Sequence, residues 1–488
     1  MKKTCSILGF CFVLSGLALF SGQERFRKGP PPPDPGQELK LPPIESVLLF
    51  NGLNVSVVTR ENLPFMSIEL VIFAGESRSP DQNPGLATLA ANMFPHSTQS
   101  RSMSDIEELV EAIGGSLRVS VNQDYALVTF SFLEDYLERA LALLGQMILQ
   151  PNFTKSEVDS VKLTTFYDLL ENERNPEFVA KRQLLRLLFK NQPYESFAFS
   201  RDVIKHWNQN DLVDFFGRYY RPNNAHLIIV GNLSLNVATR NVIRFLNLWQ
   251  RQDVPPPTLP PPKPPDKDKI CFIDVPQAKD CVVYLGTVFP LPGIQERFAL
   301  RVLNQILGGT LTSRLFMNLR ESKSFAKFAF SETEFFKAGG DFLVRAQVSP
   351  EFIVPAVEEI QKEIRGLARE SVPPSEIEQA KSYLISNFPL QIARFDGFSE
   401  KVAEIKALDG GQECWNKYSE QVALVNSERV FEAAQRFLLQ SFMIVIAGDK
   451  NTLSPHLAEF DSYDVFDNKG QFQYTWNKEK KGAAHEAR

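Results

Sequence analysis

The chain has 488 residues, of which 43% are hydrophobic and 23% are charged, a composition typical of a globular protein with more than one hydrophobic core. Its formal net charge of −5 argues against a nucleic acid or an anionic membrane surface as its partner. We therefore expect no nucleic-acid partner.

The N-terminus has the features of a secretory signal. Lys2 and Lys3 precede an apolar run from Ile7 to Phe20, and small residues follow that run. The run is too short to span a bilayer comfortably. We expect a signal peptide over residues 1–22, export across the inner membrane to the periplasm or cell envelope, and no membrane span after signal removal.

Two proline-rich stretches mark boundaries in the sequence. One follows the signal, and the other, Pro255–Pro265, contains two proline triplets that predict a semi-rigid polyproline linker. The predicted parts after the signal are a Pro-rich spacer, an N-terminal domain, a Pro-rich linker, a C-terminal domain and a charged tail, over residues 23–43, 44–252, 253–268, 269–462 and 463–488. The residues from about Asn468 onward are predicted to be disordered.

Strands and helices alternate in the first half of the chain. Period-2 patterns predict strands over Glu45–Phe50, Val55–Arg60, Ile68–Phe73, Arg118–Val121 and Ala126–Phe132. Helical periodicity appears over Leu86–Met93, Ser104–Ile113, Tyr136–Leu149 and Ser156–Glu171. Antiparallel strands mixed with long helices predict the α+β class.

The two sides of the linker resemble each other. On each side a predicted helix, a buried strand and a glycine follow in turn: Asp211–Tyr220, His226–Val230 and Gly231, then Glu428–Leu439, Phe442–Ala447 and Gly448. The offset of 217 residues between the glycines predicts a duplicated unit of about that size.

Three cysteines remain after signal removal, which is too few for a disulfide framework. Cys271 and Cys281 lie in consecutive predicted strands. Either they pair, or both are buried free thiols.

Short motifs occur in both halves. In chain order they are Leu49–Leu53, Gly75–Arg78, Gly114–Gly115, Tyr220–Ala225, Gly308–Gly309 with Ser313–Phe316, and Leu319–Glu321. Together, and in this order, they resemble the motifs of the M16 (insulinase/pitrilysin-like) metallopeptidases of the two-domain bacterial type. The resemblance covers the chain from about Leu41 to Phe460. It implies two tandem M16/LuxS-like metalloenzyme-type domains, each an antiparallel-rich sheet packed with helices.

The resemblance also implies a zinc site, because the family carries His-x-x-Glu-His on a helix and a further Glu downstream. At the matching positions this chain has Thr88 and Asn92 in place of the two histidines, and Ala91 in place of the general base. The downstream position, 76 residues after Asn92, is Asp168, and the acid one turn earlier in the family is Val161 here. We therefore expect no bound zinc, no other cofactor and no catalytic residue.

His96 is an alternative zinc ligand, because it lies four residues beyond Asn92, within reach of a meeting with Asp168. However, Pro95 is expected to end the helix before His96. A surface histidine with an ordinary partner is the preferred interpretation.

Bacterial relatives in this family often work as pairs, in which one chain supplies an Arg and a Tyr that hold the substrate carbonyl. Arg320 matches that Arg, and the Tyr position is Lys327, which still donates hydrogen bonds. The alternative is a structural ion pair of Arg320 on its own helix. The family also binds peptide along a sheet edge where this chain has Arg118-Val119, so Arg118 is a further candidate for substrate binding.

These residues are compatible with three functions. The preferred one is a non-catalytic subunit that partners an active M16 peptidase, forms a homodimer or scaffolds an envelope complex. The second is a stand-alone peptide-binding or chaperone-like module. The third is an active zinc metalloendopeptidase with unusual ligands.

Overall fold

The first half of the chain forms a six-stranded mixed sheet with strand order β1-β2-β6-β3-β5-β4. The structure is a computed structural model that describes residues 42–60, 64–393, 397, 401–404, 408 and 417–478. The predicted signal, nearly all of the spacer, Cys414 and residues 479–488 lie outside the described residues. The strands are β1 (Ile44–Leu48), β2 (Asn54–Thr59), β3 (Phe65–Ile72), β4 (Ser116–Val121), β5 (Ala126–Leu133) and β6 (Ala225–Gly231). Only β2 and β6 pair in parallel; the other pairs are antiparallel.

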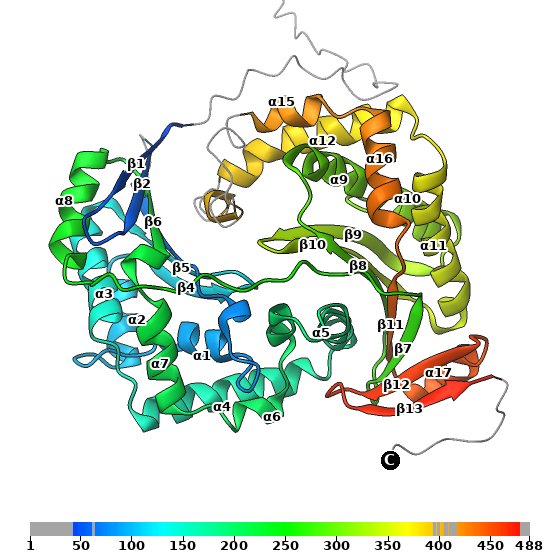
Figure 1. The fold of residues 1–488 in the computed structure, drawn as a ribbon, viewed down its shortest axis with the longest axis horizontal. Coiled ribbons are helices and arrows are strands. Elements are labelled where there is room, and N and C mark those ends of the chain that lie inside the picture. Colours follow the sequence, from blue (N-terminus) through cyan, green and yellow to red (C-terminus); the bar gives the residue numbers. More distant parts are fainter. Residues whose placement is uncertain are drawn as a thin grey trace, which may run out of the picture. The chain divides into compact units, whose positions relative to one another are not determined.

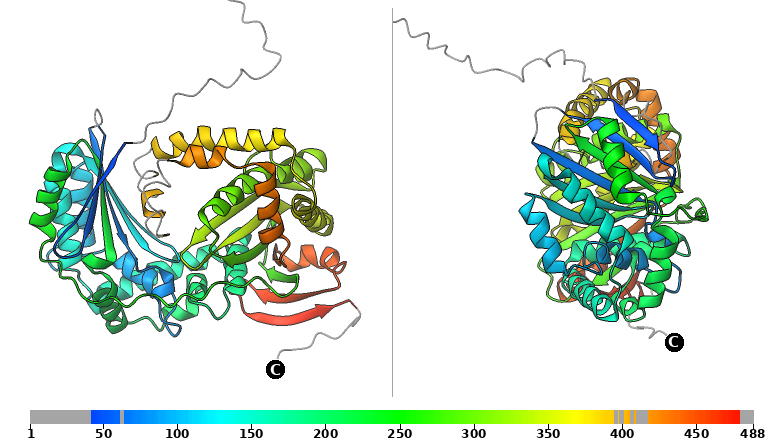
Figure 2. Two further views of the ribbon diagram at one scale, coloured as in Figure 1. Left: turned by 45° about the horizontal axis from the view of Figure 1, so that its top comes forward. Right: turned by 90° about the vertical axis from the view of Figure 1, so that its left-hand side faces the viewer.

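Helices cover one face of this sheet, as the left view of Figure 2 shows for the blue to green strands. The helices of this half are α1 (Leu86–Met93), α2 (Met103–Ala112), α3 (Leu137–Leu149), α4 (Lys155–Asn172), α5 (Pro176–Leu188), α6 (Arg201–Ile204), α7 (Gln209–Tyr219) and α8 (Leu235–Leu246). Of these, α5 packs against the second sheet instead. Short 3-10 turns occur at η1 (Glu76–Arg78), η2 (Glu134–Tyr136), η3 (Pro193–Ala198) and η4 (Pro222–Asn224). The four helices that the periodicity predicts correspond to α1 to α4.

The second half forms a seven-stranded mixed sheet with strand order β13-β12-β7-β11-β8-β10-β9. The strands are β7 (Lys269–Asp274), β8 (Cys281–Pro290), β9 (Ala326–Phe336), β10 (Gly339–Val348), β11 (Met443–Gly448), β12 (Ser462–Asp467) and β13 (Phe472–Asn477). Its helices are α9 (Ile294–Leu307), α10 (Arg314–Phe316), α11 (Ile353–Arg369), α12 (Pro374–Ala393), α15 (Tyr418–Ala423), α16 (Ser427–Leu438) and α17 (Lys450–Leu457), with a π-helical turn η5 (Met317–Ser322) and a 3-10 turn η6 (Pro350–Phe352). Figure 1 labels most of these elements.

The central strands of both sheets are buried on both faces, and the second face of each sheet is covered by elements from the other half of the chain. In the first sheet, Ile68 and Leu70 pack among that half's own helices, whereas Val71 and Ile228 pack with Phe388 of α12. In the second sheet, the cluster that contains Cys271, Ile273, Val282, Tyr284 and Val445 also contains Leu184, Leu185 and Leu188 of α5. Alternate side chains of a strand point to opposite faces, so these strands need apolar residues at almost every position.

The structure tests three predictions on the second half of the chain: the state of the two cysteines, the charged tail and the proline-rich linker. Cys271 and Cys281 are both free and buried, because β11 lies between β7 and β8 and separates them. Residues 463–477, which the sequence placed in a charged tail, form most of β12 and all of β13, so the second sheet continues to Asn477. The prediction of disorder from about Asn468 onward is therefore wrong for residues 468–477. Over 255–265 the linker contains neither helix nor strand, and Pro262 is buried within it.

No helix among the described residues combines the length and apolar character needed to cross a lipid bilayer.

Candidate functional site

Helix α1 carries the positions that the zinc motif occupies in the resembling family. It begins after Gly85, whose φ of +82° is left-handed and whose missing side chain makes room for the rings of Trp207 and Phe199. Its buried residues include Leu86, Leu89 and Met93, and it ends before Pro95. The helix therefore has the bounds that the sequence predicts.

A buried carboxylate, Glu76, holds the start of this helix. It accepts hydrogen bonds from Thr88 N at 2.9 Å, Gly85 N at 3.2 Å and Ser79 Oγ at 2.8 Å, and also from Thr88 Oγ1. Burial raises the pKa of Glu76, and these four hydrogen bonds oppose that rise. The hydroxyl of Thr88 therefore donates its hydrogen bond to Glu76.

The three motif positions do not form a zinc-binding donor set. Ala91 is 1% exposed and has no donor atom, Asn92 is exposed, and Thr88 offers only the hydroxyl that bonds Glu76. Zinc prefers imidazole, thiolate and carboxylate ligands. Within the described ranges, no group of three or more His, Cys, Asp or Glu side chains is placed to hold a metal ion. Zinc does not fit these residues.

The downstream position predicted from spacing, Asp168, is exposed on α4. Its neighbour Leu169 lines a cavity together with Thr88, whereas Asp168 does not. His96 meets a different acid, since its Nε2 lies 2.8 Å from Glu157 of α4. The predicted meeting of His96 and Asp168 does not occur, and His96 has an ordinary partner on the surface of the fold.

A cavity of about 540 Å³ opens beside Thr88. It lies between α4, α5, η3 and one face of the second sheet. Its apolar lining comes from Leu169, Phe178, Leu185, Phe197, Ala198, Phe199 and Tyr284, and its polar lining from Thr88, Asn172, Asn175, Glu177, Lys181, Arg182, Glu332 and Arg345. We call this the α5 pocket.

Two ion pairs in the α5 pocket join α5 to the second sheet. Lys181 Nζ lies 2.8 Å from Glu332 Oε1, and the guanidinium of Arg345 contacts Glu177. Burial lowers the pKa of the Lys181 ammonium, but Glu332 and nearby carboxylates outweigh burial and raise it. All four side chains are more than a third exposed, so their charged ends stay accessible.

The two helper candidates, Arg320 and Lys327, are neighbours in the structure. Arg320 lies on η5, and its Nη1 donates to the main-chain oxygen of Lys327 at 2.5 Å. Its guanidinium also lies over the ring of Phe316. Lys327 Nζ lies 2.8 Å from Asp280 Oδ1. Arg320 is half exposed, and its Nε lies 3.5 Å from Glu321 of the same turn, which is the ion pair that the sequence offered as the alternative.

Arg118 lies on β4, which is an edge strand of the first sheet, and its side chain is exposed. Among the described strands, β4 pairs only with β5. The edge is therefore open to strand addition.

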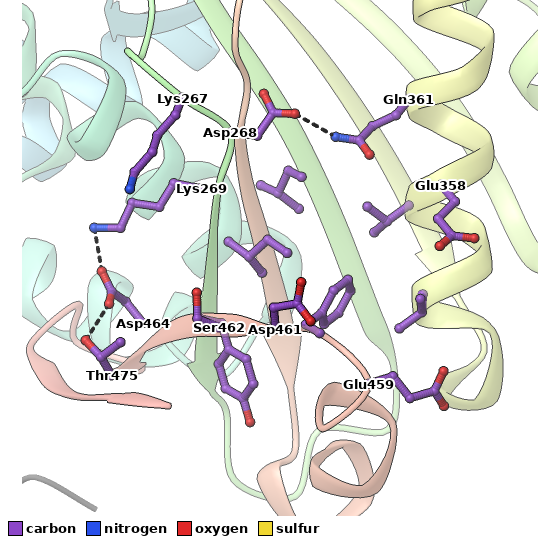
Figure 3. A pocket seen from close by; sticks show the side chains of 16 residues that line it. Lys267, Asp268, Lys269, Glu358, Gln361, Glu459, Asp461, Ser462, Asp464 and Thr475 are labelled. Carbon is purple, nitrogen blue, oxygen red and sulfur yellow. Dashed lines mark hydrogen bonds and ion pairs between the residues drawn. The ribbon is translucent and has the colours of Figure 1, made fainter. Parts of the chain in front are cut away.

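A second cavity of about 610 Å³ lies between α11 and the strands β7 and β12 (Figure 3). Five of its polar side chains pair with one another: Lys269 Nζ lies 2.5 Å from Asp464, which also accepts from Thr475, and Gln361 donates to Asp268. These contacts join the helix and strands around the cavity.

Sequence reasoning missed the contribution of α5 and of Tyr284, Glu332 and Arg345. A usable signal was present for α5, because Asn175-Pro176-Glu177 is a typical helix start, and Asn175 Oδ1 accepts from Glu177 N. No comparable signal existed for the residues of the second sheet.

Two protein-family models match this chain. The model described as Insulinase (Peptidase family M16) matches residues 55–199, and the model described as Peptidase M16 inactive domain matches residues 206–384. The chain belongs to peptidase family M16. Both halves thus have the M16-type fold that the motifs predict.

Similar chains carry two kinds of description. A Helicobacter pylori protein named a non-peptidase homolog YmxG is 25% identical over 70% of this M16 chain and 79% of its own length. A Bacillus subtilis protein named an uncharacterized zinc protease YmxG is 20% identical over 81% of this chain and 96% of its own.

Solved structures show the same fold. A protease from Helicobacter pylori superposes with a TM-score of 0.79 at 19% identity, over 84% of this chain and 100% of that one. A Pseudomonas fluorescens structure described as a peptidase M16 inactive domain has a TM-score of 0.77 at 20% identity, over 83% of this chain and 98% of that one. The inactive-domain model and the non-peptidase homologue together support a non-catalytic member of the family.

Proposed function

We propose that this chain is a non-catalytic M16 subunit that associates with an active zinc peptidase of the same family in the periplasm or cell envelope. The observation that carries the proposal is the state of α1. Thr88, Ala91 and Asn92 provide no metal-ligand set, and the Thr88 hydroxyl bonds the buried Glu76 instead. A chain built in this way acts in proteolysis only through another chain.

Arg320 is the residue through which this subunit assists its partner. It is half exposed, and its hydrogen bond to the Lys327 main chain fixes the guanidinium. A fixed guanidinium stabilises a polarised substrate carbonyl, and removal of one such donor typically lowers turnover by about 10² to 10³. Lys327 contributes less, because its flexible ammonium already pairs with Asp280.

The first experiment is recovery of the tagged chain from its native host, followed by identification of what co-purifies. We expect a stoichiometric M16 chain with an intact His-x-x-Glu-His motif. Recovery of this chain alone or as a homodimer contradicts the proposal.

The second experiment measures the partner's peptidase rate with variants at equal complex concentration. Arg320→Ala should lower the rate by about 10² or more while assembly is unchanged. Arg365→Ala is the matched control, because Arg365 is equally exposed at 51% and also pairs with an acid, but lies on α11. Equal rates for Arg320→Ala and Arg365→Ala would show that Arg320 does not assist the partner's catalysis. Scaffolding would then be the remaining role of this chain.

Stand-alone peptide binding is the second candidate, and the open edge of β4 favours it. Backbone pairing along that edge would tolerate many sequences. In that case Val119→Pro on β4 should abolish binding of extended peptides to the isolated chain, whereas Arg118→Ala should weaken it only modestly.

A further inference from the structure

The α5 pocket presents one continuous set of side chains from the second sheet. In the antiparallel register Arg345 lies opposite both Tyr284 and Phe330, and Leu343 lies opposite Glu332. Residues opposite one another share a face, so Tyr284, Glu332 and Arg345 all point toward α5. Gly286 on β8 permits this approach, because a Cβ there would lie 2.8 Å from Leu184 of α5.

The charges of the pocket alternate in sign. Glu177 and Lys181 are four residues apart on α5 and therefore on the same side of the helix. Glu177 contacts Arg345, and Lys181 contacts Glu332, so each helix charge faces its opposite on the sheet. The fifth charged lining residue, Arg182, is 8% exposed and already paired with Glu173. The accessible charges of the pocket thus sum to zero.

The walls beside these charges are apolar. Leu169, Phe178 and Leu185 come from α4 and α5, while Phe197 and Phe199 come from η3 and the residue after it. Phe197 is 37% exposed, so part of its ring is accessible to a ligand in the pocket. Such a combination of an apolar wall and a few placed polar groups is typical of small-molecule sites.

We propose that the α5 pocket binds a small zwitterion with an apolar body, of the class of apolar amino acids and dipeptides. The ligand's carboxylate contacts Lys181 and Arg345, its ammonium contacts Glu177 and Glu332, and its apolar body packs against Phe178 and Phe197. A ligand with a net charge would leave one pocket charge without a partner after desolvation, which is costly. A neutral apolar ligand would desolvate both ion pairs without replacing their water.

This inference concerns the isolated chain and does not depend on a peptidase partner. Its test is calorimetric titration of purified protein with free phenylalanine, with the dipeptide Leu-Phe, and with the N-acetylated and C-amidated forms of each. We expect sub-millimolar binding of at least one zwitterion and at least tenfold weaker binding of its two blocked forms. The stronger zwitterion identifies whether the ligand is an amino acid or a dipeptide.

Two variants place the binding in the pocket. Phe197→Ala removes a partly exposed ring that the core does not need, and Lys181→Met keeps the aliphatic stem but removes the charge; each should weaken the zwitterion at least tenfold. Arg314→Gln is the matched control, because the Arg314–Glu376 pair has similar exposure and lies at another cavity. Absence of binding to wild type at millimolar concentration, equal binding of blocked forms, or equal loss in Arg314→Gln would each overturn the inference. None of these outcomes affects partner association, which is measured separately.

Discussion

Glu76 is a carboxylate that the fold buries completely beside the start of α1. Burial of an unpaired charge is costly, but Glu76 receives four hydrogen bonds, two of them from main-chain N–H groups at the helix N-terminus. The helix dipole also favours a negative charge at that end. Thr88 therefore has a structural role in this chain, at the position that the motif resemblance matches to a zinc ligand.

Zinc binding should be restorable if the helices are placed as described. The triple variant Thr88→His, Asn92→His and Leu169→Glu should bind about one zinc per chain, since two imidazoles four residues apart and a facing carboxylate form a three-ligand site. Elemental analysis and a zinc-dependent rise in the melting temperature provide the measurement.

The matched control keeps both histidines but carries Asp168→Glu in place of Leu169→Glu. Asp168 is exposed and Leu169 lines the pocket with Thr88, so the control should bind zinc at least tenfold more weakly. Equal or tighter binding by the control would show that the sequence offset, not the described helix face, identifies the ligand position.

Asp168 and Leu169 show how much of this site could be predicted from the sequence alone. The periodicity predicts the bounds of α1, and motif order predicts which residues replace the ligands. Counting along the chain cannot decide between Asp168 and Leu169, because adjacent helical residues point about 100° apart and a one-residue error rotates the side chain out of the site.

At the level of elements, α5 joins the two halves through a buried ion cluster at its N-terminal side. Glu173 is 1% exposed; Arg201 Nε lies 2.6 Å from it and Arg182 Nη1 3.2 Å. Arg182 also donates to the main-chain oxygen of Asn468 at 2.8 Å, in the turn between β12 and β13. The cluster thus connects α4, α5, α6 and the edge of the second sheet.

Glu173→Ala should destabilise the protein by about 3 to 5 kcal/mol, because it leaves two arginines without their buried partner. Chemical denaturation gives the free energy of unfolding. Glu171→Ala is the control on the same helix, since the Glu171–Arg174 pair is largely exposed and such pairs contribute about 0 to 1 kcal/mol. A loss below about 1 kcal/mol in Glu173→Ala would mean that the cluster contributes no more than a surface pair.

The strands and helices of the first half have clear periodicity, so α1 to α4 follow from sequence. Helix α5 also has a local start signal, but its packing against β8 and β11, far away in the chain, could not be predicted from sequence. The strands β12 and β13 alternate polar with apolar residues, a local signal that the composition of the segment obscured.

At the scale of the whole described fold, each half supplies part of the other's core. Tyr194 donates to Asp124 at 2.8 Å, and Asp124 accepts from Lys337 N at 2.6 Å, so the β4–β5 turn and the β9–β10 turn are held together. Val402 and Ala403 pack with Val58 and Val230 of the first sheet. Each half has a large core of its own, and two smaller clusters shared by both halves join them.

Glu404 anchors the segment that carries Val402 and Ala403. Its carboxylate lies 2.5 Å from Arg301 of α9 and 2.7 Å from Lys401. Burial alone would raise its pKa, but Arg301 and Lys401 outweigh burial and lower the pKa from 4.5 to about 2. A carboxyl group with a lowered folded pKa stabilises the fold above its unfolded pKa, and this contribution is lost as the pH falls toward the folded value.

Glu404→Gln should therefore lower the unfolding free energy at pH 7 by at most about 3 kcal/mol, a limit that the quarter-exposed side chain reduces. It should have a smaller effect at pH 3, where the wild-type group has lost part of its contribution. Urea denaturation at both pH values measures this difference. Glu370→Gln, at an exposed glutamate after α11, is the control and should leave the acid dependence of wild type unchanged. If Glu404→Gln shifts stability equally at pH 7 and pH 3, the Arg301–Glu404–Lys401 contact contributes through packing rather than charge, and the segment that closes the first sheet is held by Val402 and Ala403 alone.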